Sequence, residues 1–200
     1  MLVRITFIAL STLILAVGPV TGIGDETTID GRVTVRGVAD NSDAVVYIDS
    51  MPGRTFVPPS TPVILDQVNL RFTPHVLPVL VGTSVAFPNS DPVRHNVFSP
   101  TASWKFNLGT YPRGSTKFRT FDKAGAITLL CNVHAEMSAY VVVTETPYFA
   151  VSDKEGKFTI RNVPPGTYVL KTWHARAKPS SIEITAGAAG IRNLEIELRK

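Results

Sequence analysis

The sequence predicts an all-β protein built from two small β-sandwiches, and three observations support this fold class. Short segments alternate between apolar and polar residues with a period of two, and residues 32–36 are the first of them. The 200 residues include 15 Pro and 14 Gly, a composition typical of chains with many turns. No stretch of ten or more residues carries the apolar stripe of an amphipathic helix.

The expected strands fall into three groups. Two early strands precede a proline-rich stretch at 52–62, which we interpret as a linker because proline is excluded from central strands. A second group lies between residues 63 and 144, and a third follows a junction at 145–147. The expected strands are 32–36, 44–48, 64–72, 76–81, 84–87, 117–121, 126–131, 140–144, 157–160, 167–171, 181–185 and 193–198.

The N-terminus has the features of a cleavable export signal. Arg4 is the only charged residue before Asp25, and residues 5–17 are almost wholly apolar. That run is shorter than the about 20 residues that span a bilayer, and small residues follow it, as at a signal cleavage site. An uncleaved membrane anchor is the alternative. We expect residues 1–22 to be removed and the mature protein to lie in the periplasm, outside the membrane.

Composition and charge exclude several classes of function. The chain is 44% hydrophobic and 18% charged, which supports a packed core. Without residues 1–22 its net charge is +3, and its basic residues are scattered along the sequence, so we expect no nucleic-acid partner. The charge allows a weak preference for an acidic partner. Cys131 is the only cysteine, so it forms no internal disulfide and is either buried or bound.

Residues 131–137 carry the strongest chemical signal. Cys131, His134 and Met137 follow one another at intervals of three residues, directly after an expected strand, and His95 offers a further donor 36 residues upstream. Two His and one Cys with a weak axial Met are typical of blue-copper sites. Zinc seldom recruits Met, and the set is too soft for calcium or magnesium. The alternative is that these residues lie close in the sequence by chance, with Cys131 buried in the core, His134 on a loop and Met137 packed against its neighbours. The pattern predicts one type 1 copper ion.

Residues 63–144 resemble the cupredoxins, the type 1 copper family that includes plastocyanin, azurin and amicyanin. The stretch 79–91, VLVGTSVAFPNSD, is similar to the family's segment before its first His ligand, and 125–131, GAITLLC, is similar to its strand into the Cys. The gaps on either side of His134 resemble the short ligand loop of amicyanins. The resemblance implies a Greek-key β-sandwich.

The same resemblance implies roles for individual residues. His95, Cys131 and His134 would be equatorial copper ligands and Met137 the axial one. Asn96 would brace the ligand loop and offer its backbone N–H to the Cys131 sulfur. The ring edge of His134 would be the electron port. The chain departs from the family at positions 135–136, Ala-Glu, where it places a charge in the ligand loop.

The tail resembles a second family, the carboxypeptidase regulatory-like, transthyretin-type β-sandwich. The segments that carry this resemblance are 153–160, DKEGKFTI, and 163–170, VPPGTYVL. That family opens with strands like 31–35 and 44–48, which here come early in the chain. We therefore expect a cupredoxin domain at 57–145, inserted into a sandwich made of 28–56 and 146–200. The combination resembles periplasmic methylamine-utilisation-type proteins.

Two functions follow as expectations. The first is an exported electron carrier that exchanges single electrons with a redox partner protein docked near His134. The alternative is a periplasmic copper-binding accessory or delivery protein, which would favour a more open site. We expect no enzymatic activity, because His75 and His174 are the only other histidines and are too few for a trinuclear copper cluster. We expect these two to be surface or hydrogen-bonded residues, unless they meet in space, and Trp104 and Tyr111 to pack in the core.

Overall fold

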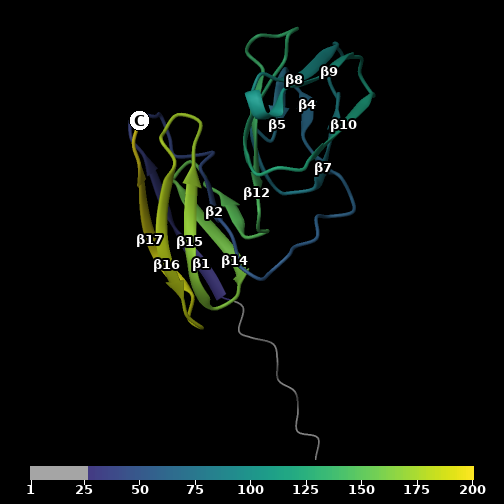
Figure 1. Cartoon of the computed structure of the whole chain (residues 1–200). Coiled ribbons are helices and arrows are strands. Elements are labelled where there is room, and N and C mark those ends of the chain that lie inside the picture. The colour runs from purple at the N-terminus through teal and green to yellow at the C-terminus, as the bar shows by residue number, and fades with distance from the viewer. Residues whose placement is uncertain (1–26) are drawn as a thin grey trace, which may run out of the picture.

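The computed structural model describes residues 27–200, and the expected export signal at 1–22 lies outside that part. The described chain holds 17 strands and one short 3₁₀ turn, η1 (Ala102–Trp104). The strands form two sandwiches that lie next to each other (Figure 1). The predicted all-β class is confirmed. No helix between residues 27 and 200 has the length and hydropathy that a bilayer crossing requires.

The first sandwich contains the strands between residues 63 and 144. One sheet has the order β6-β12-β11-β8-β9, the other has the order β10-β7-β3, and β4 and β5 form a hairpin. Apolar side chains from both sheets meet in one core. The strands are β3 (Val63–Ile64), β4 (Asp66–Val68), β5 (Arg71–Thr73), β6 (Val76–Leu80), β7 (Thr83–Pro88), β8 (His95–Ser99), β9 (Phe106–Tyr111), β10 (Thr116–Phe121), β11 (Gly125–Leu130) and β12 (Ser138–Thr144).

The second sandwich combines the earliest strands with the tail. Its sheets have the orders β14-β1-β17 and β13-β2-β15-β16, so that within residues 27–200 β1 and β2 pair only with strands that follow residue 148. β1 runs antiparallel to β14 and parallel to β17. The strands are β1 (Thr27–Val35), β2 (Val45–Ile48), β13 (Phe149–Val151), β14 (Lys157–Val163), β15 (Gly166–Trp173), β16 (Ser180–Ala186) and β17 (Ile191–Leu198).

The chain leaves the second sandwich and returns to it at adjacent points. The Ile48 N–H at the end of β2 donates to the Tyr148 carbonyl at 3.0 Å. The hydroxyl of Thr146, which is fully buried, donates to the Ile48 carbonyl at 2.7 Å. Residues 49–145 therefore occupy the place of a turn between β2 and β13. The boundaries 28–56, 57–145 and 146–200 remain a prediction, and these pairings are what an inserted domain requires.

The expected single strand at 64–72 is wrong. Asn69 and Leu70 have φ values of +55° and +57°, in the left-handed region, so the chain reverses between β4 and β5. Their N–H groups donate to the carboxylate of Asp91, which holds this turn in place. β8, β9 and β13 were not predicted from the sequence. β8 is buried on both faces, so its polar residues break the alternation that reveals a half-buried strand.

Candidate metal centre

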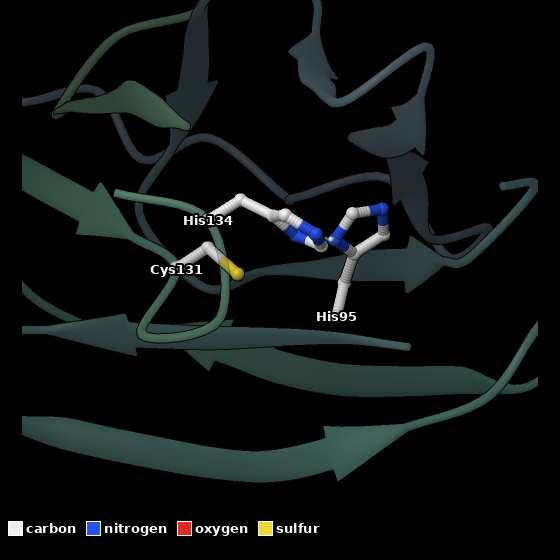
Figure 2. Close-up of side chains that lie close together, drawn as sticks. All are labelled: His95, Cys131 and His134. Carbon is white, nitrogen blue, oxygen red and sulfur yellow. Dashed lines mark hydrogen bonds between the residues drawn. The ribbon is translucent and has the colours of Figure 1, made fainter. Parts of the chain in front are cut away.

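Three donor side chains converge at one end of the first sandwich. His95 is the first residue of β8, Cys131 directly follows β11, and His134 lies in the loop before β12. The ligand atoms of the three residues lie within 4.8 Å of one another, and the two histidine Nδ1 atoms are 3.1 Å apart. Figure 2 shows the thiol and both imidazoles directed toward a common point. Strands distant in sequence thus place these donors together.

Asp91 orients the imidazole of His95. The His95 side chain is fully buried, and its Nε2 lies 2.7 Å from Asp91 Oδ2. A proton on Nε2 that donates to Asp91 leaves the Nδ1 lone pair directed at His134. Burial raises the pKa of Asp91, but hydrogen bonds from the Leu70 N–H, from His95 and from the Asn69 N–H outweigh it and hold this pKa below its ordinary value. Asp91 is therefore an anionic anchor for one donor.

The ligand loop is closed by its own backbone. The Cys131 N–H donates to the Met137 carbonyl at 3.3 Å, and the Met137 N–H donates to the His134 carbonyl at 3.1 Å. The Val133 N–H lies 3.4 Å from the Cys131 sulfur and donates to it. Cys131 and Met137 are 4% and 1% exposed and share one core cluster. The loop thus brings Met137 back beside Cys131, while axial ligation by its sulfur remains a prediction.

The donor set fits a copper ion. Two nitrogens that bind one ion at about 2.0 Å each can lie at most about 4 Å apart, and the 3.1 Å between the two Nδ1 atoms meets this condition. A thiolate with two imidazoles suits copper or zinc, and the nearby thioether favours copper. Hard cations prefer oxygen donors, which this cluster lacks among its three members.

Comparisons with known proteins give partial similarities. A family model described as fn3_3, polysaccharide lyase family 4, domain II, matches residues 122–190, about a third of the chain. A search among curated proteins found no match. A copper-containing nitrite reductase from Thermus scotoductus SA-01 is 25% identical over 50% of this chain with a TM-score of 0.42, and the chain spans a quarter of that enzyme's length.

Two smaller copper proteins are matched along most of their length. A reduced mutant of amicyanin is 23% identical over 42% of this chain and 84% of its own, with a TM-score of 0.40. A purple cupredoxin from Nitrosopumilus maritimus is 23% identical over 41% of this chain and 99% of its own, with a TM-score of 0.38. The first sandwich consists of two facing sheets with a His-Cys-His cluster at one end, and this arrangement decides how the domain is assigned. The first sandwich is a cupredoxin-like domain. The second is a separate small β-sandwich domain.

Tyr111 lies beside the candidate metal centre of the cupredoxin-like domain, where it pairs with His95 across β8 and β9. Its hydroxyl donates to the Phe87 carbonyl at 2.9 Å and accepts from Gln67 Nε2 at 2.6 Å. Burial, followed by the nearby charges of Cys131 and Asp66, raises the pKa of Tyr111 to about 12, although the Gln67 hydrogen bond opposes this. Tyr111 and Trp104 are both buried in the core, as expected.

The expected roles of Asn96 differ from what the cupredoxin-like domain shows. Its side-chain amide donates to Asn107 Oδ1 at 2.8 Å and to the Gly109 carbonyl at 2.9 Å, so it braces β9 and not the ligand loop. The hydrogen bond to the Cys131 sulfur comes from Val133. The physical reason is register, because Asn96 pairs with Thr110 on β9 and its side chain reaches along that strand.

His75 and His174 lie near the junction between the cupredoxin-like domain and the second sandwich. Both line one pocket there, and His75 Nδ1 lies 2.7 Å from Asp43 Oδ2. Within residues 27–200 they complete no group of three metal donors. Burial lowers the pKa of His174, and its Nδ1 accepts a hydrogen bond from the Arg176 N–H. Both histidines are therefore hydrogen-bonded residues in this fold.

Asp91 belongs to the candidate metal centre through its contact with His95 but was not predicted from the sequence. It lies four positions before His95 and is 4% exposed. Metal-bound histidines commonly donate their second ring N–H to a carboxylate, so an acidic residue shortly before a candidate ligand was the available signal. The preceding Asn89 supports it, since its side-chain oxygen accepts the Asp91 N–H at 3.0 Å.

Proposed function

We propose that the protein is an exported type 1 copper protein that transfers single electrons between redox partners through a site of His95, Cys131, His134 and Met137. The observation that carries the proposal is the convergence of a buried thiol with two histidine Nδ1 atoms only 3.1 Å apart. When bound, copper would alternate between Cu(I) and Cu(II) and so accept and release one electron. Residues 1–22 are proposed as the export signal.

The chain holds the donors in fixed positions. His95 is fixed by β8 and by Asp91, whereas Cys131 and Met137 are fixed by the ends of β11 and β12 and by the hydrogen bond between their backbones. Burial of these three residues excludes water from the donors. Donors that are packed in this way keep their positions when the charge at the centre changes, which favours fast electron transfer.

His134 is the donor best placed as the electron port. It is half-buried, whereas the other two members of the cluster and Met137 are buried. The exposed ligand-loop residues 132 and 133 precede it, and 135 and 136 follow it. A partner that covers this loop would therefore come nearest to the centre through the His134 ring. The proposed docking of the redox partner near His134 rests on this difference in exposure.

Copper loading with optical and electrochemical readout tests the proposal. The purified protein is given one equivalent of Cu(II), and its visible spectrum and its reduction potential are measured. An intense thiolate-to-Cu(II) absorption that disappears and returns over repeated reduction and oxidation is expected. The same experiment on Cys131→Ser should give no such band. A colourless protein that retains only Cu(I) would instead indicate an accessory or delivery protein.

A further inference from the structure

One edge of the cupredoxin-like domain is formed by a segment that carries basic residues and no acidic ones. Residues 92–121 contain five basic and no acidic residues. They span β8, β9 and β10, and β9 and β10 are the outermost strands of their two sheets. These two strands lie on the side of the domain turned away from the second sandwich (Figure 1). We call this surface the basic edge, and its basic residues are Arg94, Lys105, Arg113, Lys117 and Arg119.

The basic edge begins beside the metal centre. Arg94 precedes His95 directly, and the register of β8 and β9 pairs His95 with Tyr111, two residues before Arg113. The Arg94 guanidinium donates to the Thr110 carbonyl at 2.9 Å, and Gly114 N donates to Asn89 O at 2.8 Å, which fixes the loop that carries Arg113. The Arg94 guanidinium and the loop that carries Arg113 therefore lie at the end of the sandwich where the donors converge.

Charge on this edge is available for a partner. All five basic residues are exposed. In the described residues 27–200 none of them forms an ion pair with an acidic side chain. Arg119 lies over the rings of Trp104 and Phe106, 5.9 Å and 5.2 Å from their centroids, so this residue also covers the core. Within residues 27–200, none of the other four basic residues lies over an aromatic ring in this way.

Exposed apolar side chains accompany the charges. Phe118 on β10 is 58% exposed, and Val93, next to Arg94, is 40% exposed. On β10, Lys117 and Arg119 pair with the core residues Phe87 and Val85, whereas Phe118 pairs with Ala86, so Phe118 lies on the opposite face of the strand from these two charges. Cationic side chains also protect edge strands from pairing, and Lys117 and Arg119 on the outermost strand β10 can serve this purpose as well.

We propose that the basic edge is the docking surface for a redox protein with an acidic surface, which it orients toward the metal centre. This inference rests on the proposed electron-transfer function. Complementary charge raises the rate of encounter and selects the orientation of the complex. Val93, exposed next to Arg94, supplies an apolar contact of the docked state. The five basic residues fall in one acid-free stretch of the sequence, which the fold places at the outermost strands of the two sheets.

Small redox reagents of opposite charge test the sign of this surface. The copper-loaded, reduced protein gives one electron to hexacyanoferrate(III), which becomes hexacyanoferrate(II), or to tris(phenanthroline)cobalt(III), which becomes the cobalt(II) complex. Rate constants are measured by stopped flow from low to high ionic strength. We expect the rate with the anionic reagent to fall as salt increases, and the rate with the cationic reagent to rise.

A pair of matched variants locates the effect. Arg113→Glu with Lys117→Glu should lower the hexacyanoferrate(III) rate at low salt by about tenfold, with the visible spectrum unchanged. Arg161→Glu with Lys157→Glu removes one Arg and one Lys from exposed positions on β14 of the second sandwich and should have a much smaller effect. Equal losses in both pairs, or no loss in the first, would overturn the docking surface.

An acidic polymer tests the class of partner. Poly-L-glutamate should slow the reaction with hexacyanoferrate(III) by occupying the basic edge, and it should have little effect on the Arg113→Glu, Lys117→Glu variant. Tighter binding of duplex DNA than of poly-L-glutamate would assign the edge to nucleic acid and overturn the inference. A protein that exchanges electrons with neither reagent would contradict the proposed function itself, whereas normal exchange without a charge preference would contradict only the docking surface.

Discussion

The Asp91 carboxylate accepts a hydrogen bond from His95 Nε2 at 2.7 Å while both side chains are almost fully buried. The same carboxylate accepts the N–H groups of Asn69 and Leu70, two residues held in left-handed conformations. One buried anion therefore ties the β4–β5 turn to His95, the first donor of the candidate metal centre. Because it serves three donors, Asp91 contributes both to the stability of the fold and to the orientation of His95.

Asp91→Asn should destabilise the protein even without copper. An amide has one acceptor oxygen in place of two and turns its NH2 toward existing donors, so at least one buried donor loses its partner, at a cost of about 1–3 kcal/mol. Urea unfolding of the metal-free protein measures this loss. Asp122→Asn is the control, because Asp122 is exposed and its replacement should change stability by less than about 0.5 kcal/mol. Equal stabilities of the two variants would show that Asp91 has no such role.

Met137→Leu should leave copper bound and raise the reduction potential. Leucine has nearly the same volume, so the fold should lose less than about 1.5 kcal/mol, but the thioether donor that tunes such sites is removed. Protein-film voltammetry and the visible spectrum measure the effect. Met51→Leu is the matched control, since Met51 is also buried but belongs to the core of the second sandwich. An unchanged potential in Met137→Leu would exclude Met137 as a ligand.

Glu197→Gln should weaken the dependence of stability on acid pH. Hydrogen bonds from Arg36 and Arg199, at 2.7 and 2.6 Å, together with the charges of both arginines, lower the pKa of Glu197 from its ordinary value near 4.5 to about 2. A lowered pKa means that the contribution to stability is present above pH 4.5 and is lost as the pH falls toward 2. Thermal unfolding between about pH 2 and 6 should show a shallower decline in the variant.

The size of this pH effect should depend on salt, because Glu197 and its partners are at the surface and solvent screens them. Glu195→Gln is the matched control on the same strand, and Glu195 forms no ion pair within residues 27–200. A decline with pH that is equally shallow in both variants would assign the effect to net charge and not to the Glu197 pairs.

Thr146→Val should loosen the junction between the two sandwiches. The substitution keeps the side-chain shape but removes the donor to the Ile48 carbonyl, which leaves a buried acceptor unpaired at a cost of about 1–3 kcal/mol. Guanidinium unfolding followed by tryptophan fluorescence measures it. Thr185→Val, whose hydroxyl pairs with Thr167 at the surface, should cost much less. A Thr146→Val protein as stable as the wild type would show that the junction hydrogen bond is dispensable.

The alternation of apolar and polar residues and the positions of a few rare residue types predicted the fold class and the candidate site. The all-β class follows from period-two segments, and the cluster of His95, Cys131 and His134 follows from one Cys, a neighbouring His and an upstream His. Other features depend on contacts that no local pattern records. β8 is buried on both faces and shows no alternation. The turn at Asn69 and Leu70 depends on an acceptor more than twenty residues away in the sequence.

The position of the basic edge on the surface also depends on contacts that the local sequence does not record. Its basic residues fall in one acid-free stretch of thirty positions, but the outermost places of β9 and β10 in their sheets follow only from long-range strand pairing. The role of Asp91 was equally hidden, because a carboxylate four residues before a histidine has meaning only when both are buried. Long-range pairing, and not residue identity, decides these features.

The parallel alignment of β1 and β17 determines how the protein responds to mechanical load. Tension applied at residues 27 and 198 would shear these two strands against each other, so that all their shared hydrogen bonds resist at once. The path of this force runs through the second sandwich alone, because residues 49–145 branch from neighbouring points on β2 and β13. The cupredoxin-like domain, and the candidate metal centre in it, would carry no tension until the strands of the second sandwich had separated.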